Sequence, residues 1–170
     1  MEELPQDFGN LQSLVNFNAS GCSSLSRLPE SFGQLANLER LFLQGCGKLQ
    51  SLPTFIGGIT KLRVLDILNS GVEELPEDFG KLQRLVEFNA DDCSSLSRLP
   101  ESCNQLANLE RLDLETCLKF QSLPTSIGGL MKMEFLNLSN SGVQKLSEDF
   151  GKLQSLEDFN TSGYSSLSRL

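Results

Sequence analysis

The sequence predicts a stacked solenoid of the α/β class, with a parallel β-sheet on its concave face and 3₁₀ or short irregular helices on its convex face. Leu-Pro pairs, or their equivalents, recur every 23 or 24 residues along the whole chain. Within each period a triplet that begins with leucine or phenylalanine alternates as a short strand does, and in all but the fifth period a phenylalanine- or isoleucine-glycine pair follows the Leu-Pro place. A period in the twenties is typical of solenoids, in which each unit needs its neighbours to bury its apolar side.

A second period of 71 residues lies above the first. The segments 14–29 and 85–100 are near copies, the segment 156–170 resembles both, and 19 of 25 positions are identical between 4–28 and 75–99. We therefore predict a single domain over residues 1–170, built from about seven repeats of 23–24 residues in blocks of three. Neither end carries a polar cap, so we expect a piece of a longer array that self-associates end to end.

Each repeat has a predicted strand, a turn and a tighter coil. The triplet 41–43 represents the strand, whose equivalents stack in parallel at about 4.8 Å. After the proline the apolar residues are three apart, as at Phe32, Leu35 and Leu38, with Gly33 between them. This spacing favours a 3₁₀ turn over a full α-helix.

Cysteine occupies the turn after several strands. Cys22 and Cys93 are three repeats apart, about 14 Å at sheet spacing, and the chain has no histidine, so we predict no metal site and no cofactor. A disulfide between neighbouring repeats is within reach, but we favour reduced, structural thiols in a reducing compartment. Cys103 replaces a core residue and is expected to be buried. The residues at the turn place are Cys22, Cys46, Ser70, Cys93, Cys117, Ser141 and Tyr164.

With these spacings the chain resembles the leucine-rich repeat family over all seven repeats, which implies a segment of a horseshoe. The G-C-S-S-L and G-C-G-K-L turns, the Leu-Pro pairs and S-F-G-Q-L-A-N-L-E-R-L are similar to the repeat domain of plant intracellular disease-resistance receptors. The similarity is to the nucleotide-binding kind with a Toll/interleukin-receptor domain. It implies a cytoplasmic protein. The chain has no phosphate-binding G-x-x-x-x-G-K-[ST] motif, so nucleotide binding would belong to other parts of such a receptor.

The charge of the chain restricts its partners. Its 22 acidic and 14 basic residues give a formal net charge of −8, which argues against nucleic acid or an anionic membrane. No apolar run is long enough for a membrane span. We therefore expect a protein partner, of basic character, on the concave face.

Candidate binding residues are those that the repeat pattern does not specify and that point outward from the strands. Two groups stand out: a run of acids on neighbouring strands with one arginine among them, and apolar side chains that a core does not require. The alternative for the acids is solubility and resistance to association. The candidates are Arg40, Phe42, Val64, Asp66, Leu68, Glu87, Asn89, Asp91, Asp92, Arg111, Asp113, Glu115 and Phe135.

Three classes of function compete. We favour a non-enzymatic protein-recognition module, the ligand-sensing or autoregulatory repeat domain of a plant-type immune receptor. An intracellular scaffold resembling Ras-pathway adaptors shares the Leu-Pro pairs and the 23-residue step but prefers asparagine to cysteine at the turn. Repeats fused to an enzyme are the least favoured, because the chain has no histidine, no activated thiol and no enclosed acid pair. We predict no catalytic residues.

Overall fold

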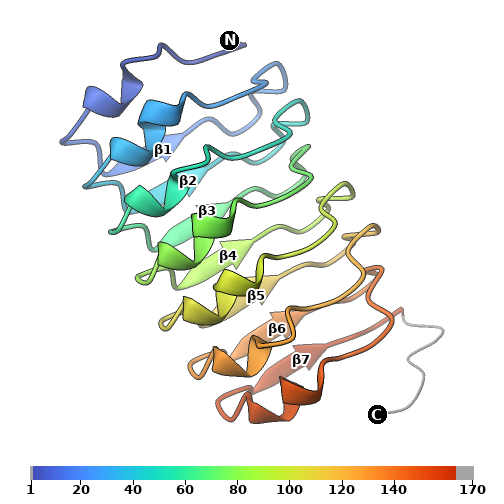
Figure 1. Ribbon diagram of the computed structural model, residues 1–170. Helices are drawn as coiled ribbons and strands as arrows, with labels where there is room; N and C mark the ends of the chain where they lie inside the picture. Colours follow the sequence, from blue (N-terminus) through green and yellow to red (C-terminus); the bar gives the residue numbers. More distant parts are fainter. Residues whose placement is uncertain (1, 164–170) are drawn as a thin grey trace.

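The computed structural model describes residues 2–163, which form a stack of seven short parallel strands in one open sheet. Figure 1 shows the strands following one another in chain order from the amino end to the carboxyl end. Consecutive strands pair without slippage of register, so equivalent places of the repeat lie side by side. The strands are β1 (Asn16–Asn18), β2 (Arg40–Phe42), β3 (Val64–Asp66), β4 (Glu87–Asn89), β5 (Arg111–Asp113), β6 (Phe135–Asn137) and β7 (Asp158–Asn160).

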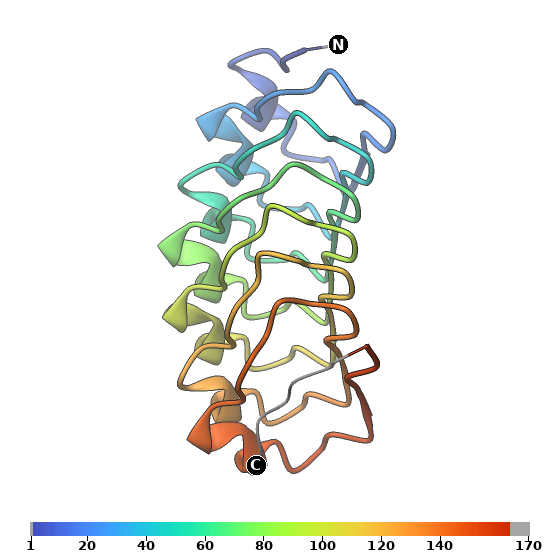
Figure 2. The ribbon, with the colours of Figure 1, turned by 90° about the vertical axis from the view of Figure 1, so that its right-hand side faces the viewer.

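A 3₁₀ turn precedes each strand, as the spacing of three predicts. Figure 2, a view turned by 90°, shows these turns collected along one side of the stack. Residues such as Pro29 enter the turn with an extended backbone (ψ 152°), and each turn closes with a hydrogen bond such as Leu35 N–H to Phe32 O. The turns are η1 (Phe8–Asn10), η2 (Glu30–Gln34), η3 (Ile56–Gly58), η4 (Glu77–Lys81), η5 (Glu101–Gln105), η6 (Ile127–Gly129) and η7 (Glu148–Lys152).

Glycine holds the same place in six of the seven described turns, with Asn104 in the other, and five of these glycines touch the neighbouring repeat. A Cβ placed on Gly33 would overlap the carbonyl oxygen of Phe55, and one on Gly80 would overlap that of Ser102. Backbone therefore touches backbone between repeats, and the missing side chain sets how closely the turns stack.

The core lies between the sheet and the turns and consists of stacked leucines with one phenylalanine pair per three repeats. Phe79 and Phe88 are buried with ring centroids 5.2 Å apart, and Phe8 and Phe17 lie 5.1 Å apart. Phe159 pairs with Phe150 at 4.9 Å but remains 37% exposed. The phenylalanine that takes a leucine place every 71 residues thus packs against a phenylalanine of the preceding 3₁₀ turn.

The cysteines of the described residues are free thiols, as predicted. The Cys93 thiol donates to the carbonyl of Ile67 (3.0 Å) and that of Cys117 to Ala90 (3.1 Å), so each thiol binds the backbone of the preceding repeat. Cys103 is buried in the core, where desolvation raises its pKa well above the ordinary value and keeps the thiol neutral. Tyr164, at the last turn place, lies outside the described residues.

The two phenylalanines at equivalent places provide a stability test. We expect Phe88→Ala to lower the free energy of unfolding by about 3–5 kcal/mol, because it empties a closed part of the core. Phe159→Ala, at the same place of the repeat but exposed, should cost much less. Denaturant titration of both variants measures the difference. Equal losses would contradict this account of the core.

Candidate functional site

The side of the sheet that points away from the core is here called the sheet face. It carries the third and fifth places of each repeat, counted from the leucine or methionine that precedes the strand. The third places form one row across the strands and the fifth places a second row. The first row is Asn16, Arg40, Val64, Glu87, Arg111, Phe135 and Asp158; the second is Asn18, Phe42, Asp66, Asn89, Asp113, Asn137 and Asn160.

The second row has a structural task that sequence reasoning missed. In six of its seven members a side-chain Oδ1 accepts the N–H two residues later, at 2.8 to 3.1 Å, and so ends the strand. Asp66, Asn89 and Asp113, predicted as partner-binding, belong to this set. The signal was present in the sequence, because asparagine or aspartate fills the row except at Phe42.

The eighth place of the repeat is also constrained. Its φ is positive in every described repeat, from 51° at Asn69 to 86° at Gly163. Asp92, predicted as partner-binding, holds this left-handed place with φ 56°, and Thr116 does so with φ 54°. A β-branched residue is strained in this region, whereas asparagine and glycine tolerate it. The residue type at this place is therefore restricted by the positive φ as well as by what the surface binds.

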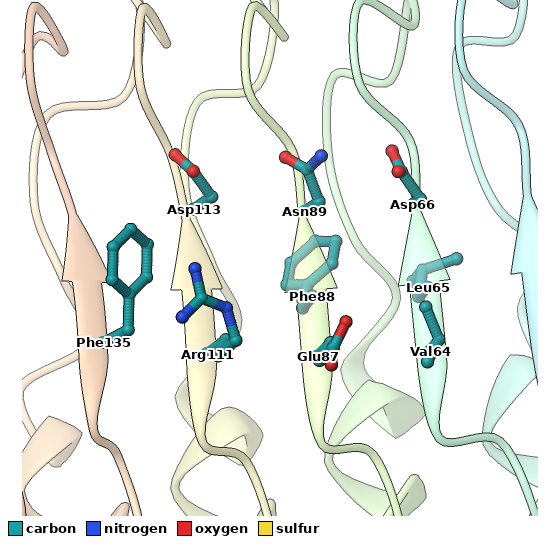
Figure 3. A pocket seen from close by; sticks show the side chains of 9 residues that line it. All are labelled: Val64, Leu65, Asp66, Glu87, Phe88, Asn89, Arg111, Asp113 and Phe135. Carbon is teal, nitrogen blue, oxygen red and sulfur yellow. The ribbon is translucent and has the colours of Figure 1, made fainter.

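A shallow hollow of about 170 Å³ opens on the sheet face between β3 and β6 (Figure 3). Core residues Leu65 and Phe88 contribute to its lining, which sequence reasoning did not foresee. The rest of the lining comes from both rows. The predicted site residues that the structure brings together here are Val64, Asp66, Glu87, Asn89, Arg111, Asp113 and Phe135.

Arg111 in this hollow contacts an aromatic ring. Its guanidinium carbon lies 3.9 Å from the centroid of the Phe135 ring, a cation–π contact worth about 0.5–1 kcal/mol at an exposed site. Arg111 is also the register partner of Glu87 on β4, yet these two side chains form no ion pair. The hollow therefore has an oriented cation and, beside it, a carboxylate that no cation neutralises directly.

The remaining acidic candidates lie at the carboxyl ends of β4 and β5. Burial raises the pKa of Asp91, and the nearby carboxylates of Asp113 and Glu115 raise it further. Burial likewise raises the pKa of Asp113, while hydrogen bonds from the Glu115 N–H and Asn137 oppose the rise. Asn137 also donates to Glu115 Oε2 at 2.9 Å. Within residues 2–163 no group of three or more His, Cys, Asp or Glu is placed to hold a metal ion.

The predicted apolar group is not a single patch. Phe42 is in register with Asp66, and Val64 is in register with Arg40, so the apolar residues lie on diagonals between polar ones. All three of Phe42, Val64 and Leu68 are half-buried. A polar chain runs past them, with Ser20 Oγ donating to Gln44 Oε1 (2.5 Å) and Gln44 Nε2 to Asp66 Oδ2 (2.5 Å). Phe42 and Leu68, with Arg40, Asp91, Asp92 and Glu115, lie outside the lining of the hollow.

Solved structures similar to this chain include leucine-rich repeat domains and receptors. The leucine-rich repeat domain of the type III effector XopL has a TM-score of 0.61 at 20% identity over 96% of this chain and 73% of that one. A TDR receptor has a TM-score of 0.56 at 21% identity over 93% of this chain.

This chain has the leucine-rich repeat fold. A leucine-rich repeat protein of Leptospira interrogans gives a TM-score of 0.49 at 20% identity over 94% of this chain. The chain spans 63% of the length of that protein and 32% of the TDR receptor. No family model and no curated protein matches the sequence. Among the described residues, no helix of this leucine-rich repeat stack is long and apolar enough to cross a membrane.

The strain at Thr116 can be tested directly. We expect Thr116→Asn to stabilise the protein by about 1 kcal/mol, because asparagine already holds this left-handed place in two other repeats. Gly45→Thr should destabilise it by a similar amount, although a Cβ there would find its nearest neighbour only at 3.7 Å. Thermal unfolding of both variants measures the effect. A loss of stability in Thr116→Asn would show that the threonine is favoured for another reason.

The acidic group predicts a pH dependence. Because the folded pKa values of Asp91 and Asp113 are raised, the stability they contribute is complete below the ordinary aspartate pKa and is lost as the pH rises through the folded values. The variant Asp91→Asn/Asp113→Asn should therefore be more stable than the wild type at pH 7, by on the order of 1 kcal/mol. The advantage should shrink as the pH falls toward 4. Melting temperatures across this range measure it, and a difference independent of pH would refute the assignment.

Proposed function

We propose that this chain is a non-enzymatic protein-recognition domain that binds its partner on the sheet face, over the hollow between β3 and β6. The observation that carries the proposal is the composition of that hollow. It combines an apolar floor, an aromatic ring, an oriented arginine and carboxylates in a shallow depression of the sheet face. Arginine and aromatic residues surrounded by polar ones are the residue types that contribute most to protein interfaces.

The shape of the hollow also favours a protein over a small molecule. At about 170 Å³ it is smaller than the clefts that bury a drug-sized ligand, which measure about 300–1,000 Å³. One protruding side chain of a partner would fill it. The rest of the contact would then spread over the neighbouring strands, as a flat repeated surface allows.

We further propose that this is the ligand-sensing or autoregulatory repeat domain of a plant-type immune receptor in the cytoplasm. Support comes from the cysteine-containing turns, the Leu-Pro pairs and the alternation with shorter repeats, which resemble those receptors. The unpaired cysteines, four of them in two pairs at equivalent places of adjacent repeats, are consistent with a reducing compartment. The domain uses no cofactor in this proposal.

The test compares two faces of the same protein. We expect Arg111→Ala and Phe135→Ala each to weaken binding of a protein partner about tenfold or more, because truncating a central interface residue costs about 1.4 kcal/mol or more. Phe55→Ala, which removes a 66% exposed phenylalanine away from the sheet face, should leave the affinity unchanged. Partners enriched on the immobilised chain would be purified and their dissociation constants measured by calorimetry.

Unchanged affinity in both sheet-face variants, or a loss confined to Phe55→Ala, would overturn the proposed binding face. Circular dichroism of each variant would establish that the fold is retained, since Arg111 and Phe135 both lie on the surface side of the sheet.

A further inference from the structure

The charge on the sheet face and at the ends of its strands is concentrated in the second half of the stack. At the carboxyl ends of β4 and β5 lie Asp91, Asp92, Asp113 and Glu115. At the amino ends of β4 to β7 lie Glu87, Glu110, Glu134, Glu157 and Asp158. We call these nine residues, none of which is buried or ion-paired, the acidic half.

Only Arg111 offsets these carboxylates at the corresponding places of β4 to β7. The acidic half and Arg111 together carry a formal charge of −8, which equals the formal net charge of the entire chain. The first half of the face is balanced, because Glu39 and Asp66 are matched by Arg40 and Arg63. The acids are therefore not spread evenly, as the explanation by solubility requires. Instead, the face is balanced in charge at β1 to β3 and negative at β4 to β7.

The hollow lies where the two groups of acids approach each other. Glu87 belongs to the group at the amino ends of the strands and Asp113 to the group at the carboxyl ends. Both line the hollow together with Phe88 and Phe135 (Figure 3). Arg111 contacts the ring of Phe135 and forms no ion pair, so the Glu87 carboxylate remains free to pair with a cation from outside. A long basic side chain has the matching form, with an apolar stem for the floor and a charged head for the rim.

We propose that the partner presents a cationic segment that crosses β4 to β7, with lysine and arginine side chains on both acid groups and one of them in the hollow. This rests on the proposed function, that the sheet face binds protein, and adds the chemistry and the orientation of the partner. Charge complementarity of this kind speeds association and selects the partner.

Other occupants fit the surface less well. The described carboxylates do not gather into a metal site. Nucleic acid would be repelled by the acidic half. A second copy of the chain offers no excess of positive charge, because its residues outside the acidic half and Arg111 carry no formal net charge.

The experiment uses two triple variants with the same change in charge. The sheet-face variant is Asp91→Asn/Asp113→Asn/Glu115→Gln, which keeps the side-chain shapes and the oxygen that accepts the strand-ending N–H. The matched control is Glu73→Gln/Glu77→Gln/Glu148→Gln, three exposed carboxylates away from the sheet face. Fluorescence anisotropy would measure the binding of labelled octalysine and octaarginine at low and at physiological salt.

We expect the sheet-face variant to bind both peptides about tenfold more weakly and the control to stay within about twofold of the wild type. The wild-type affinity should fall as salt increases, since the pairs are exposed to solvent. Glu134→Gln/Glu157→Gln provides an independent check at exposed positions, and it should weaken binding as well. Equal weakening by the sheet-face variant and the control would show non-specific attraction and overturn the proposal.

The outcome separates this inference from the proposed function. If the peptides do not distinguish the variants while protein binding still depends on Phe135 and Arg111, the sheet face is the interface and the basic partner is wrong. If protein binding is independent of Phe135 and Arg111 as well, the proposed function fails too.

Discussion

The spacing of backbone against backbone between repeats is the constraint on which this structure depends. Parallel strands fix the distance between neighbouring repeats at about 4.8 Å on one side. On the other side, glycines such as Gly33 and Gly80 allow the 3₁₀ turns to follow at a matching distance, because a side chain there would overlap the next carbonyl. With both sides fixed, each leucine of the core is buried by its equivalents above and below. Thiols such as that of Cys93 add a bond from one repeat to the backbone of the one before.

The same constraint decides which surface positions are free to carry function. Each strand is only three residues long. The side-chain oxygens of Asn89, Asp113 and their equivalents end it by accepting the backbone N–H two residues later. The chain must then turn through a left-handed residue, as at Asp92 and Thr116. The fifth and eighth places of each repeat are therefore shared between structure and surface chemistry. The third place is the freer one, and it supplies the Glu87, Arg111 and Phe135 side chains of the hollow.

The charge distribution connects this scaffold to recognition. Duplication of a three-repeat block would give a face of uniform character, yet the acids gather on its second half. Burial raises the pKa values of Asp91 and Asp113, and neighbouring carboxylates raise them further, so keeping these groups charged costs stability. Evenly spread charge would be sufficient for solubility, and the concentration of acids is the ground on which we propose a cationic partner.

The sequence by itself determined the repeat, the strands, the 3₁₀ turns, the reduced thiols and the burial of Cys103 and the leucines. These follow from spacing, because equivalent places in a solenoid meet equivalent neighbours. It also identified the outward residues, and the hollow includes seven of the candidates that it named. Only the tertiary structure decided that Phe42 and Val64 are diagonal and not adjacent, that Arg111 lies over Phe135, and that Asp113 serves the backbone. Those outcomes depend on side-chain directions and on distances between repeats, and a one-dimensional period contains neither.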